Sequence, residues 1–334
     1  MPKPMLKELK LNEPAETFLL VVQKQERVTK TGDPYLVLRL ADASGEIDAN
    51  LWKEYAELFP QLKENIFVKV RGALGEYKGK KQFNVEKLRL AAEGEVELAD
   101  FIRQTKKDIP QTLQKVKDIL GSITDPDLKK LTALFLSDRE LLADFARAPA
   151  AKDLHSACLG GLLEHTAALL ELAVFLAGQY PLDRDLLLLG VFLHDIGKTR
   201  ELSYPRAGES RLSFDYTDAG GLVGHIVIGV QILQEKLAAL PDFPAQKKLL
   251  LEHMILAHHG LPEFGSPKTP LTKEAIALHH IDNIDAKLVG FDEFIEKNPT
   301  DTSWTVRAFM FENNKLYIGG RNAPAAAGAP KSEG

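Results

Sequence analysis

The sequence predicts a two-part protein, in which an all-β segment is followed by an all-α segment. From about residue 15 to 95, apolar residues mostly alternate with polar ones, as they do in half-buried strands. From 96 to about 298, apolar residues recur at helical spacing instead. All nine histidines lie between residues 155 and 280, inside the helical segment. Because 334 residues exceed one typical core, two domains are expected.

The composition is that of an ordinary globular protein, with 45% hydrophobic and 27% charged residues. The net charge of −5 carries no whole-chain signature of nucleic-acid binding. Cys158 is the single cysteine, which excludes a disulfide framework and fits a reducing compartment. The first residues are charged rather than signal-like, and the leucine-rich stretches fall short of a membrane span. We therefore expect a cytoplasmic protein that does not bind membranes; whether it forms homo-oligomers stays open.

Five stretches with strand patterning follow one another in the first segment: FLLVVQKQ, PYLVLRLAD, EIDANLW, NIFVKVRGAL and KQFNVEKLRL. KTGDP, ADASGE and EYKGKK supply turn signals between them. KEYAELFPQL reads as a short helix between the third and fourth strands. Five strands with a helix before the fourth is the order of an OB-type barrel, which we place at residues 12–95.

One face of this barrel is expected to carry polar and aromatic side chains. In PYLVLRL, Leu36, Leu38 and Leu40 face one way, so Tyr35 and Arg39 face the other. EIDANLW repeats the alternation, and the loop EYKGKK adds lysines at the rim that such folds use to bind single strands. The expected nucleic-acid contacts are Tyr35, Arg39, Trp52, Tyr77, Lys78, Lys80 and Lys81. The alternative interpretation is a solvated strand face with a lysine-rich hairpin.

The second segment divides further. Residues 96–150 are expected to form a helical connector with amphipathic segments such as QTLQKVKDILGSI, and residues 151–298 the main helical bundle. SWTVRAFMFENNKLYIGG, within 299–320, predicts a β-hairpin that turns at Asn313 and Asn314. Residues 321–334 are rich in Ala, Pro and Gly and predict a disordered tail.

The stretch LLLLGVFLHDIGKTREL ends an apolar helix in His194 and Asp195, a pair that is costly to bury without partners. Comparable residues sit on or at the ends of other predicted helices, in this order: His165 in GLLEHTAALL, His225 in GHIVIGV, His258 and His259 in ILAHHG, and Asp282 in HHIDNIDAK. Successive elements are 29, 31, 33 and 23 residues apart. A bundle can project such residues into one interior, as helical metal sites do.

Histidine and carboxylate ligands without thiolates suit Mn, Fe, Zn or Mg. Asp195 is the natural bridging ligand of a two-metal site, which activates water and clamps a phosphoryl group. Lys198 follows closely and offers a point charge for a phosphate. Any one of these histidines, taken alone, is more often a hydrogen-bonded core or surface residue than a ligand. The roles of His155, His253, His279 and His280 stay open on the sequence alone.

The pattern H…HD…D resembles the signature of the HD superfamily of metal-dependent phosphohydrolases, and HDIGK is its fuller form in several branches. His225 and the pair His258–His259 resemble the branch whose members hold two metals. With an OB-like domain before the bundle, the chain resembles the YhaM-type 3′→5′ exoribonucleases of bacteria over about residues 12–315. The segments that carry this resemblance are GGLLEHT, HDIGK, GHIVIG, LAHHG, HHIDNIDAK and TGDPYLVLRLADASGEIDANLW.

The resemblance implies stepwise removal of nucleotides from the 3′ end of single-stranded RNA, with single-stranded DNA as an alternative substrate. It also implies two divalent ions, Mn²⁺ first, with Mg²⁺, Fe²⁺ or Co²⁺ as alternatives. Asp195 and Lys198 are the expected catalytic residues. One ion would be held by His165, His194, Asp195 and Asp282, and the other by Asp195, His225, His258 and His259.

Two other classes of function stay open. An HD-superfamily nucleotide or cyclic-dinucleotide phosphohydrolase is the main alternative, although HHGLPEFGSPKTP lacks the Gly-Tyr-Pro element of the enzymes that open cyclic dinucleotides. The other class is a nucleic-acid-binding module with an inert bundle. Intact candidate ligands at every position argue against an inert bundle.

Overall fold

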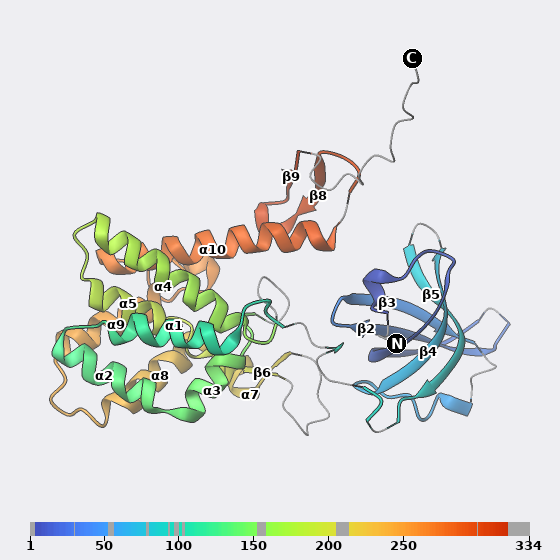
Figure 1. The fold of residues 1–334 in the computed structure, drawn as a ribbon, viewed down its shortest axis with the longest axis horizontal. Helices are drawn as coiled ribbons and strands as arrows, with labels where there is room; N and C mark the ends of the chain where they lie inside the picture. The colour runs from blue at the N-terminus through green and yellow to red at the C-terminus, as the bar shows by residue number, and fades with distance from the viewer. Residues whose placement is uncertain are drawn as a thin grey trace, which may run out of the picture.

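The computed structural model describes residues 4–29, 31–52, 57–77, 80–92, 94–96, 100–101, 104–151, 158–204, 214–298 and 300–319. A closed β-barrel lies at one end of the molecule's longest axis and a helical bundle at the other (Figure 1). The predicted fold class, an all-β barrel followed by an all-α bundle, is confirmed.

The barrel consists of β1 (Pro14–Val28), β2 (Pro34–Asp42), β3 (Gly45–Leu51), β4 (Phe67–Tyr77) and β5 (Lys80–Leu90). The strands close in the order β1-β2-β3-β5-β4. All neighbours are antiparallel except β3 and β5, whose short parallel pairing closes the barrel. This order leaves β2 and β3 side by side, so their outward side chains share one surface.

The alternation read from the sequence matches the barrel core. Leu36, Leu38 and Leu40 are fully buried, and Ala49 and Leu51 on β3 join them. The predicted helix between the third and fourth strands falls partly on residues outside the described ranges. Its described part, residues 57–62, forms a single helical turn and a bend rather than an α-helix.

The bundle contains α1 (Ile109–Gly121), α2 (Pro126–Ser137), α3 (Arg139–Arg147), α4 (Gly161–Gln179), α5 (Arg184–Leu193), α6 (Lys198–Glu201), α7 (Asp218–Leu222), α8 (His225–Leu237), α9 (Ala245–Ala257) and α10 (Lys273–Lys297). A short pair of strands, β6 (Leu202–Ser203) and β7 (Asp215–Tyr216), follows α6. Side-chain caps at Asp108, Asp125, Asp138 and Asp183 begin α1, α2, α3 and α5. The predicted connector contributes α1–α3, and these helices share a core with α4 and α5.

The helix α4 is the axis of this core. It is apolar on most faces, packs against α1, α5 and α10, and places His165 on a buried face with 3% of its surface exposed. Among the described residues, α4 alone has the length and apolar character to cross a membrane, but half of the qualifying window is buried inside the bundle. Its hydrophobicity is therefore accounted for by its central position.

The C-terminal hairpin pairs β8 (Trp304–Ala308) with β9 (Asn314–Tyr317). The hairpin was predicted, but the position of its turn was wrong. Asn314 already pairs with Ala308, and the connection is a helical turn, Phe309–Phe311, followed by Glu312 and Asn313 in the left-handed region. The long connection lets Phe311 contact Phe291 of α10, with ring centroids 5.9 Å apart. The predicted disordered tail lies outside the described residues.

Candidate metal centre and nucleic-acid interface

Five helices bring the predicted ligands together at one place in the bundle. His165 comes from α4, His194 and Asp195 from the end of α5, His225 from the start of α8, His258 and His259 from the end of α9, and Asp282 from α10. Five of the seven residues lie at helix ends, whereas His165 and Asp282 project inward from within α4 and α10.

Asp195 lies between the two halves of this cluster. Its Oδ2 is 3.3 Å from Nε2 of His194 and 3.9 Å from Nε2 of His165. Its Oδ1 is 3.5 Å from Nε2 of His225 and 3.6 Å from Nε2 of His258. The carboxylate, with 3% of the residue exposed, therefore presents one oxygen to each half.

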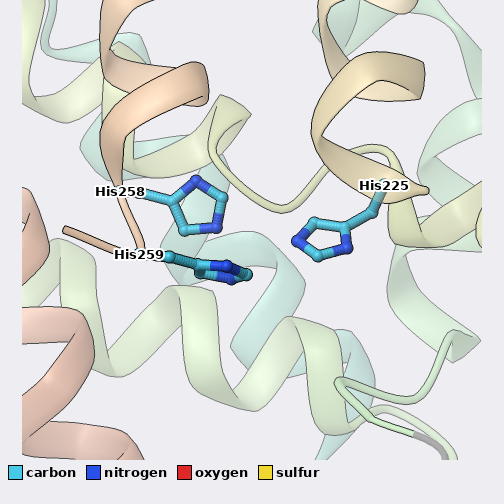
Figure 2. Close-up of side chains that lie close together, drawn as sticks. All are labelled: His225, His258 and His259. Atoms are coloured by element: carbon cyan, nitrogen blue, oxygen red, sulfur yellow. The ribbon is translucent and has the colours of Figure 1, made fainter. Parts of the chain in front are cut away.

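The ligand atoms form two groups, each with all atoms within 4.8 Å of one another: His165, His194 and Asp195 in the first, and His225, His258 and His259 in the second. We call these groups the first and second clusters. Figure 2 shows the second cluster, with His258 and His259 at the end of one helix and the ring of His225 facing them from another. Asp282 lies beside the first cluster, with Oδ1 3.2 Å from Nε2 of His165.

Gly197 allows the two clusters to approach each other. A Cβ at this position would lie 2.0 Å from the carbonyl oxygen of His225, closer than any real contact. The glycine of HDIGK therefore lets the start of α8 pack against the end of α5. This contact sets His225 opposite Asp195.

Hydrogen bonds at Nδ1, the outer ring nitrogen that points away from the centre, fix the tautomers of the histidines. The inner nitrogen is Nε2. Three of the histidines donate Nδ1–H to backbone carbonyls: His194 to Val191 at 2.6 Å, His258 to Ile255 at 2.7 Å, and His259 to Phe264 at 2.9 Å. A carbonyl only accepts, so the proton of each neutral ring lies on Nδ1 and the lone pair on Nε2. The Nε2 lone pairs point into the centre.

The other two histidines are held by carboxylates that the sequence analysis missed. Nδ1 of His165 lies 2.6 Å from Oδ2 of Asp285, and Nδ1 of His225 lies 3.0 Å from Oε1 of Glu201. Asp285 had a signal, because it stands three residues after Asp282 and so on the same face of α10. Glu201 had none, because 23 residues separate it from His225 in the sequence.

The donor set fits divalent cations. Within the described part of the chain, Nε2 of His194, His225 and His258 and Oδ1 of Asp195 are buried without a hydrogen-bond partner. Leaving such an atom unsatisfied costs about 1–3 kcal/mol, so four converging at one place indicate a ligand. Burial, together with the neighbouring imidazoles of His259 and His194, holds the pKa of His258 well below its usual range, which keeps it a neutral donor.

Two carboxylates, those of Asp282 and Asp285, contact His165 of the first cluster. Burial opposes a charged imidazole, but the carboxylates of Asp282 and Asp285 outweigh it and raise the pKa of His165 to about 10. The same ion pair and neighbouring imidazoles hold the pKa of Asp282 below its usual range despite burial. The site therefore stabilises positive charge at the inner nitrogen of His165, where a cation would replace the proton.

Lys198 contacts Asp195 directly, with Nζ 2.6 Å from Oδ2. Burial disfavours the ammonium, but Asp195 raises the pKa of Lys198, so the side chain stays charged. The structure thus places Lys198 at the centre, on the same oxygen that faces the first cluster.

The remaining histidines have other partners. His253 accepts a hydrogen bond from the backbone N–H of Leu271 at 2.9 Å, and His279 donates Nδ1–H to the carbonyl of His258 at 2.8 Å. His280 is exposed and contacts the ring of His279. His155 lies outside the described residues. His279 therefore helps to hold the end of α9 in place.

On the barrel, the predicted aromatic residues Tyr35, on β2, and Trp52, directly after β3, meet. The rings of Tyr35 and Trp52 stack with centroids 5.1 Å apart and planes 24° apart, and 48% of Trp52 is exposed. Arg39, on the same face, pairs with Asp48 at 3.2 Å and Glu46 at 3.9 Å. Arg39 is thus already neutralised by its neighbours, whereas the aromatic pair is open to solvent.

The predicted basic rim is only partly described. Lys81 and Arg39 line a groove of about 660 Å³ along the β2–β3 edge, together with acidic side chains such as Asp48. Tyr77 and Lys80 are paired across β4 and β5, and Lys78 lies outside the described residues.

Two family matches agree with the division of the chain into a barrel and a helical bundle. Residues 162–287 match the HD domain, and residues 20–91 match the OB-fold nucleic acid binding domain. The HD match indicates a metal-dependent phosphohydrolase, and its span contains both clusters. Together, the two domains support a metal-dependent phosphohydrolase that acts on nucleic acid.

Similar solved structures include a domain of replication protein A from Methanococcus maripaludis, at 22% identity and a TM-score of 0.24, covering 27% of this chain and 94% of that one. The single-stranded DNA binding protein of Thermus aquaticus is 20% identical with a TM-score of 0.23, over 25% of this chain and 42% of that one. PriB from Ralstonia solanacearum is 16% identical with a TM-score of 0.22, over 24% and 97%.

Proposed function

We propose that this protein is a metal-dependent 3′→5′ exoribonuclease that hydrolyses single-stranded RNA, with single-stranded DNA as a second substrate. The observation that carries the proposal is the position of Asp195, which presents one buried oxygen to each of two histidine clusters. Two divalent ions at such a site activate water and neutralise a phosphate during in-line displacement. Mn²⁺ is the ion we expect, because the resemblance to YhaM-type enzymes implies it and imidazoles and carboxylates can hold it.

The ligands divide between two ions in this proposal. His194 and His165, with Asp282 beside them, would hold one ion together with Asp195. The members of the second cluster would hold the other ion, also with Asp195. Because the outer nitrogens are already hydrogen-bonded, the inner nitrogens need no rearrangement to bind.

Lys198 has a different task in the proposal. Its ammonium lies at the first cluster, paired with Asp195, and is not a metal ligand because a protonated amine has no lone pair to donate. With Asp195 shared as a metal ligand, the ammonium of Lys198 would be free to contact a phosphate oxygen of the substrate. Lys198 would thereby stabilise charge that develops on the phosphate during hydrolysis.

In this proposal, the barrel gives the enzyme its preference for a nucleic-acid polymer over small nucleotides. The exposed Tyr35–Trp52 pair offers a stacking surface for bases, which does not depend on sequence. The order of domains and the segments HDIGK and LAHHG, which resemble YhaM-type enzymes, support exonucleolytic action from the 3′ end. A phosphohydrolase for small nucleotides would have no use for such a barrel.

End-labelled RNA tests the proposal. The full-length protein is incubated with a 5′-labelled single-stranded RNA and, separately, with the same RNA circularised, each with Mn²⁺, Mg²⁺, Fe²⁺ or Co²⁺. We expect a ladder that shortens from the 3′ end of the linear RNA and no cleavage of the circle. Cleavage of the circle would identify an endonuclease instead. Intact RNA together with hydrolysis of mononucleotides or cyclic dinucleotides would contradict the proposal and favour a small-molecule phosphohydrolase.

A further inference from the structure

Two carboxylates, the buried Glu201 and the half-buried Asp285, stand behind the candidate ligands rather than among them. Asp285 holds the outer nitrogen of His165, and Glu201 holds the outer nitrogen of His225. The corresponding nitrogens of His194, His258 and His259 are held by backbone carbonyls. Each cluster therefore contains one histidine with a carboxylate behind it, and the remaining histidines have neutral partners.

This distribution has a physical consequence. A carboxylate that accepts Nδ1–H increases the electron density at Nε2 more than a neutral carbonyl does, and it fixes the ring plane. We infer that Asp285 and Glu201 are positioning residues that set the affinity of the two metal sites independently. Asp285 acts on the ion held with His165, and Glu201 on the ion held with His225. This inference deepens the proposed function and rests on its two-metal centre.

Asp285 is well placed for this single task. It lies three residues after Asp282 on α10, so the two carboxylates contact opposite nitrogens of one imidazole, Asp282 at Nε2 and Asp285 at Nδ1. Its side chain is 14% exposed and lines a cleft of about 550 Å³ beside α4. Replacing Asp285 should therefore disturb the first cluster with little effect on the bundle's core.

Glu201 has a second, structural contact. Its Oε1 also accepts the backbone N–H of His225 at 2.9 Å. Gly224, the residue before α8, offers no side-chain cap, so Glu201 takes over that role from the end of α6. Replacing Glu201 should therefore lower both the stability of the fold and the affinity of the second cluster.

Metal binding by the full-length protein separates these effects. Asp285→Asn and Glu201→Gln keep a neutral acceptor of similar shape, and Glu235→Gln, which removes a surface pair with Arg200, is the matched control. Isothermal titration of metal-free protein with Mn²⁺ should show two ions for wild type and the control. Each of the two variants should bind one ion about 10- to 100-fold more weakly and keep the other unchanged.

Crossed backgrounds identify which ion is affected. In His165→Ala, adding Asp285→Asn should change nothing, whereas adding Glu201→Gln should weaken the ion that remains. In His225→Ala, the reverse should hold. A merely structural role would not give this crossed pattern, because lost stability would weaken both ions together. Thermal melts show whether each variant folds; if Glu201→Gln does not fold, the Asp285→Asn comparison decides alone.

Wild-type affinities in both variants, or weakening of the same ion by both, would overturn the inference. That outcome is distinguishable from failure of the proposed function. If the wild-type protein degrades RNA but the variants bind Mn²⁺ normally, only the inference falls. If two ions bind with the crossed pattern but RNA is untouched, the inference stands and the exonuclease proposal falls. A wild-type protein that binds fewer than two ions would contradict both.

Discussion

The ammonium of Lys198 lies 2.6 Å from Oδ2 of Asp195, at the point where the first cluster meets the second. We propose that Lys198 stabilises charge on the phosphate and that Asp195 is shared between two ions, so this contact joins the two roles. Substituting Asp195 is expected to reduce metal binding, whereas substituting Lys198 is expected to lower turnover while the metal stays bound. Substitutions can therefore separate the two roles.

Asp195→Asn keeps the size of the side chain but removes the charge that two cations would share. We expect bound Mn²⁺ to fall from about two ions per chain to less than about one, and hydrolysis to be lost, because a neutral amide oxygen replaces the anionic carboxylate that both ions need. Metal analysis after dialysis, beside a thermal melt, checks this. Wild-type metal content with wild-type turnover would remove Asp195 from the centre.

Lys198→Ala should have the opposite effect on metal content. Since the ammonium is not a ligand, the variant should still bind two ions, while turnover falls on the order of a hundredfold or more from loss of one oriented charge. Single-turnover hydrolysis measured at saturating Mn²⁺ checks this. Lys198→Arg, which keeps the charge, should recover part of the rate. Unchanged turnover in the alanine variant would make Lys198 a structural partner of Asp195 only.

Trp52→Ala should weaken binding to single-stranded RNA and leave the metal centre intact. One stacked base contributes roughly 1–3 kcal/mol, and the variant loses the exposed half of the Tyr35–Trp52 pair. Fluorescence anisotropy with a labelled oligonucleotide measures the change. Trp304→Ala is the matched control, because Trp304 is 51% exposed and Trp52 is 48% exposed. Equal effects of the two substitutions would contradict a specific role for the barrel face.

Asp185→Asn tests a contribution to the unfolding free energy that does not involve the metal centre. Oδ2 of this buried carboxylate accepts three hydrogen bonds, from the N–H and hydroxyl of Thr124 and from the N–H of Asp125, and so joins α5 to the start of α2. Although burial opposes ionisation, these hydrogen bonds hold the pKa of Asp185 below its usual range. Losing the charge should cost about 1–3 kcal/mol of unfolding free energy near neutral pH.

The pH dependence of that cost follows from the lowered pKa. The contribution is fully present above the pKa of the unfolded chain and is lost as the pH falls through the lower pKa of the folded protein. The difference between urea melts of wild type and variant should therefore be largest near neutral pH and shrink as the pH is lowered below about 4, the usual pKa of an aspartate in an unfolded chain. A difference that grows on acidification would contradict the assignment.

The sequence was most informative where the signal is local. The alternation in PYLVLRL predicted which leucines fill the barrel, and the order of histidines predicted which residues converge. The parallel pairing of β3 with β5 could not be read in this way, because it joins distant strands without a local pattern. The hairpin turn was misplaced because two asparagines are a turn signal, while the contact of Phe311 with α10 favours a longer connection.

The same distinction explains what was missed around the metal centre. The ligand types are recognisable because a histidine and an aspartate directly after an apolar run, as in LLLLGVFLHD, are costly to bury without partners. Asp285 could have been found from its spacing to Asp282, whereas Glu201 is an ordinary acidic residue that only the fold brings to the outer nitrogen of His225. The ion pairs of Arg39 with Asp48 and Glu46 could not be foreseen either, because they depend on the register of β2 with β3.

Anomalous diffraction from crystals of the full-length protein grown with Mn²⁺ would locate the ions themselves. We expect two peaks, one among His165, His194 and Asp282 and one among His225, His258 and His259, with one oxygen of Asp195 bound to each. A single peak, or two peaks of which either lies beyond reach of Asp195, would contradict the shared carboxylate and the two-ion centre built on it.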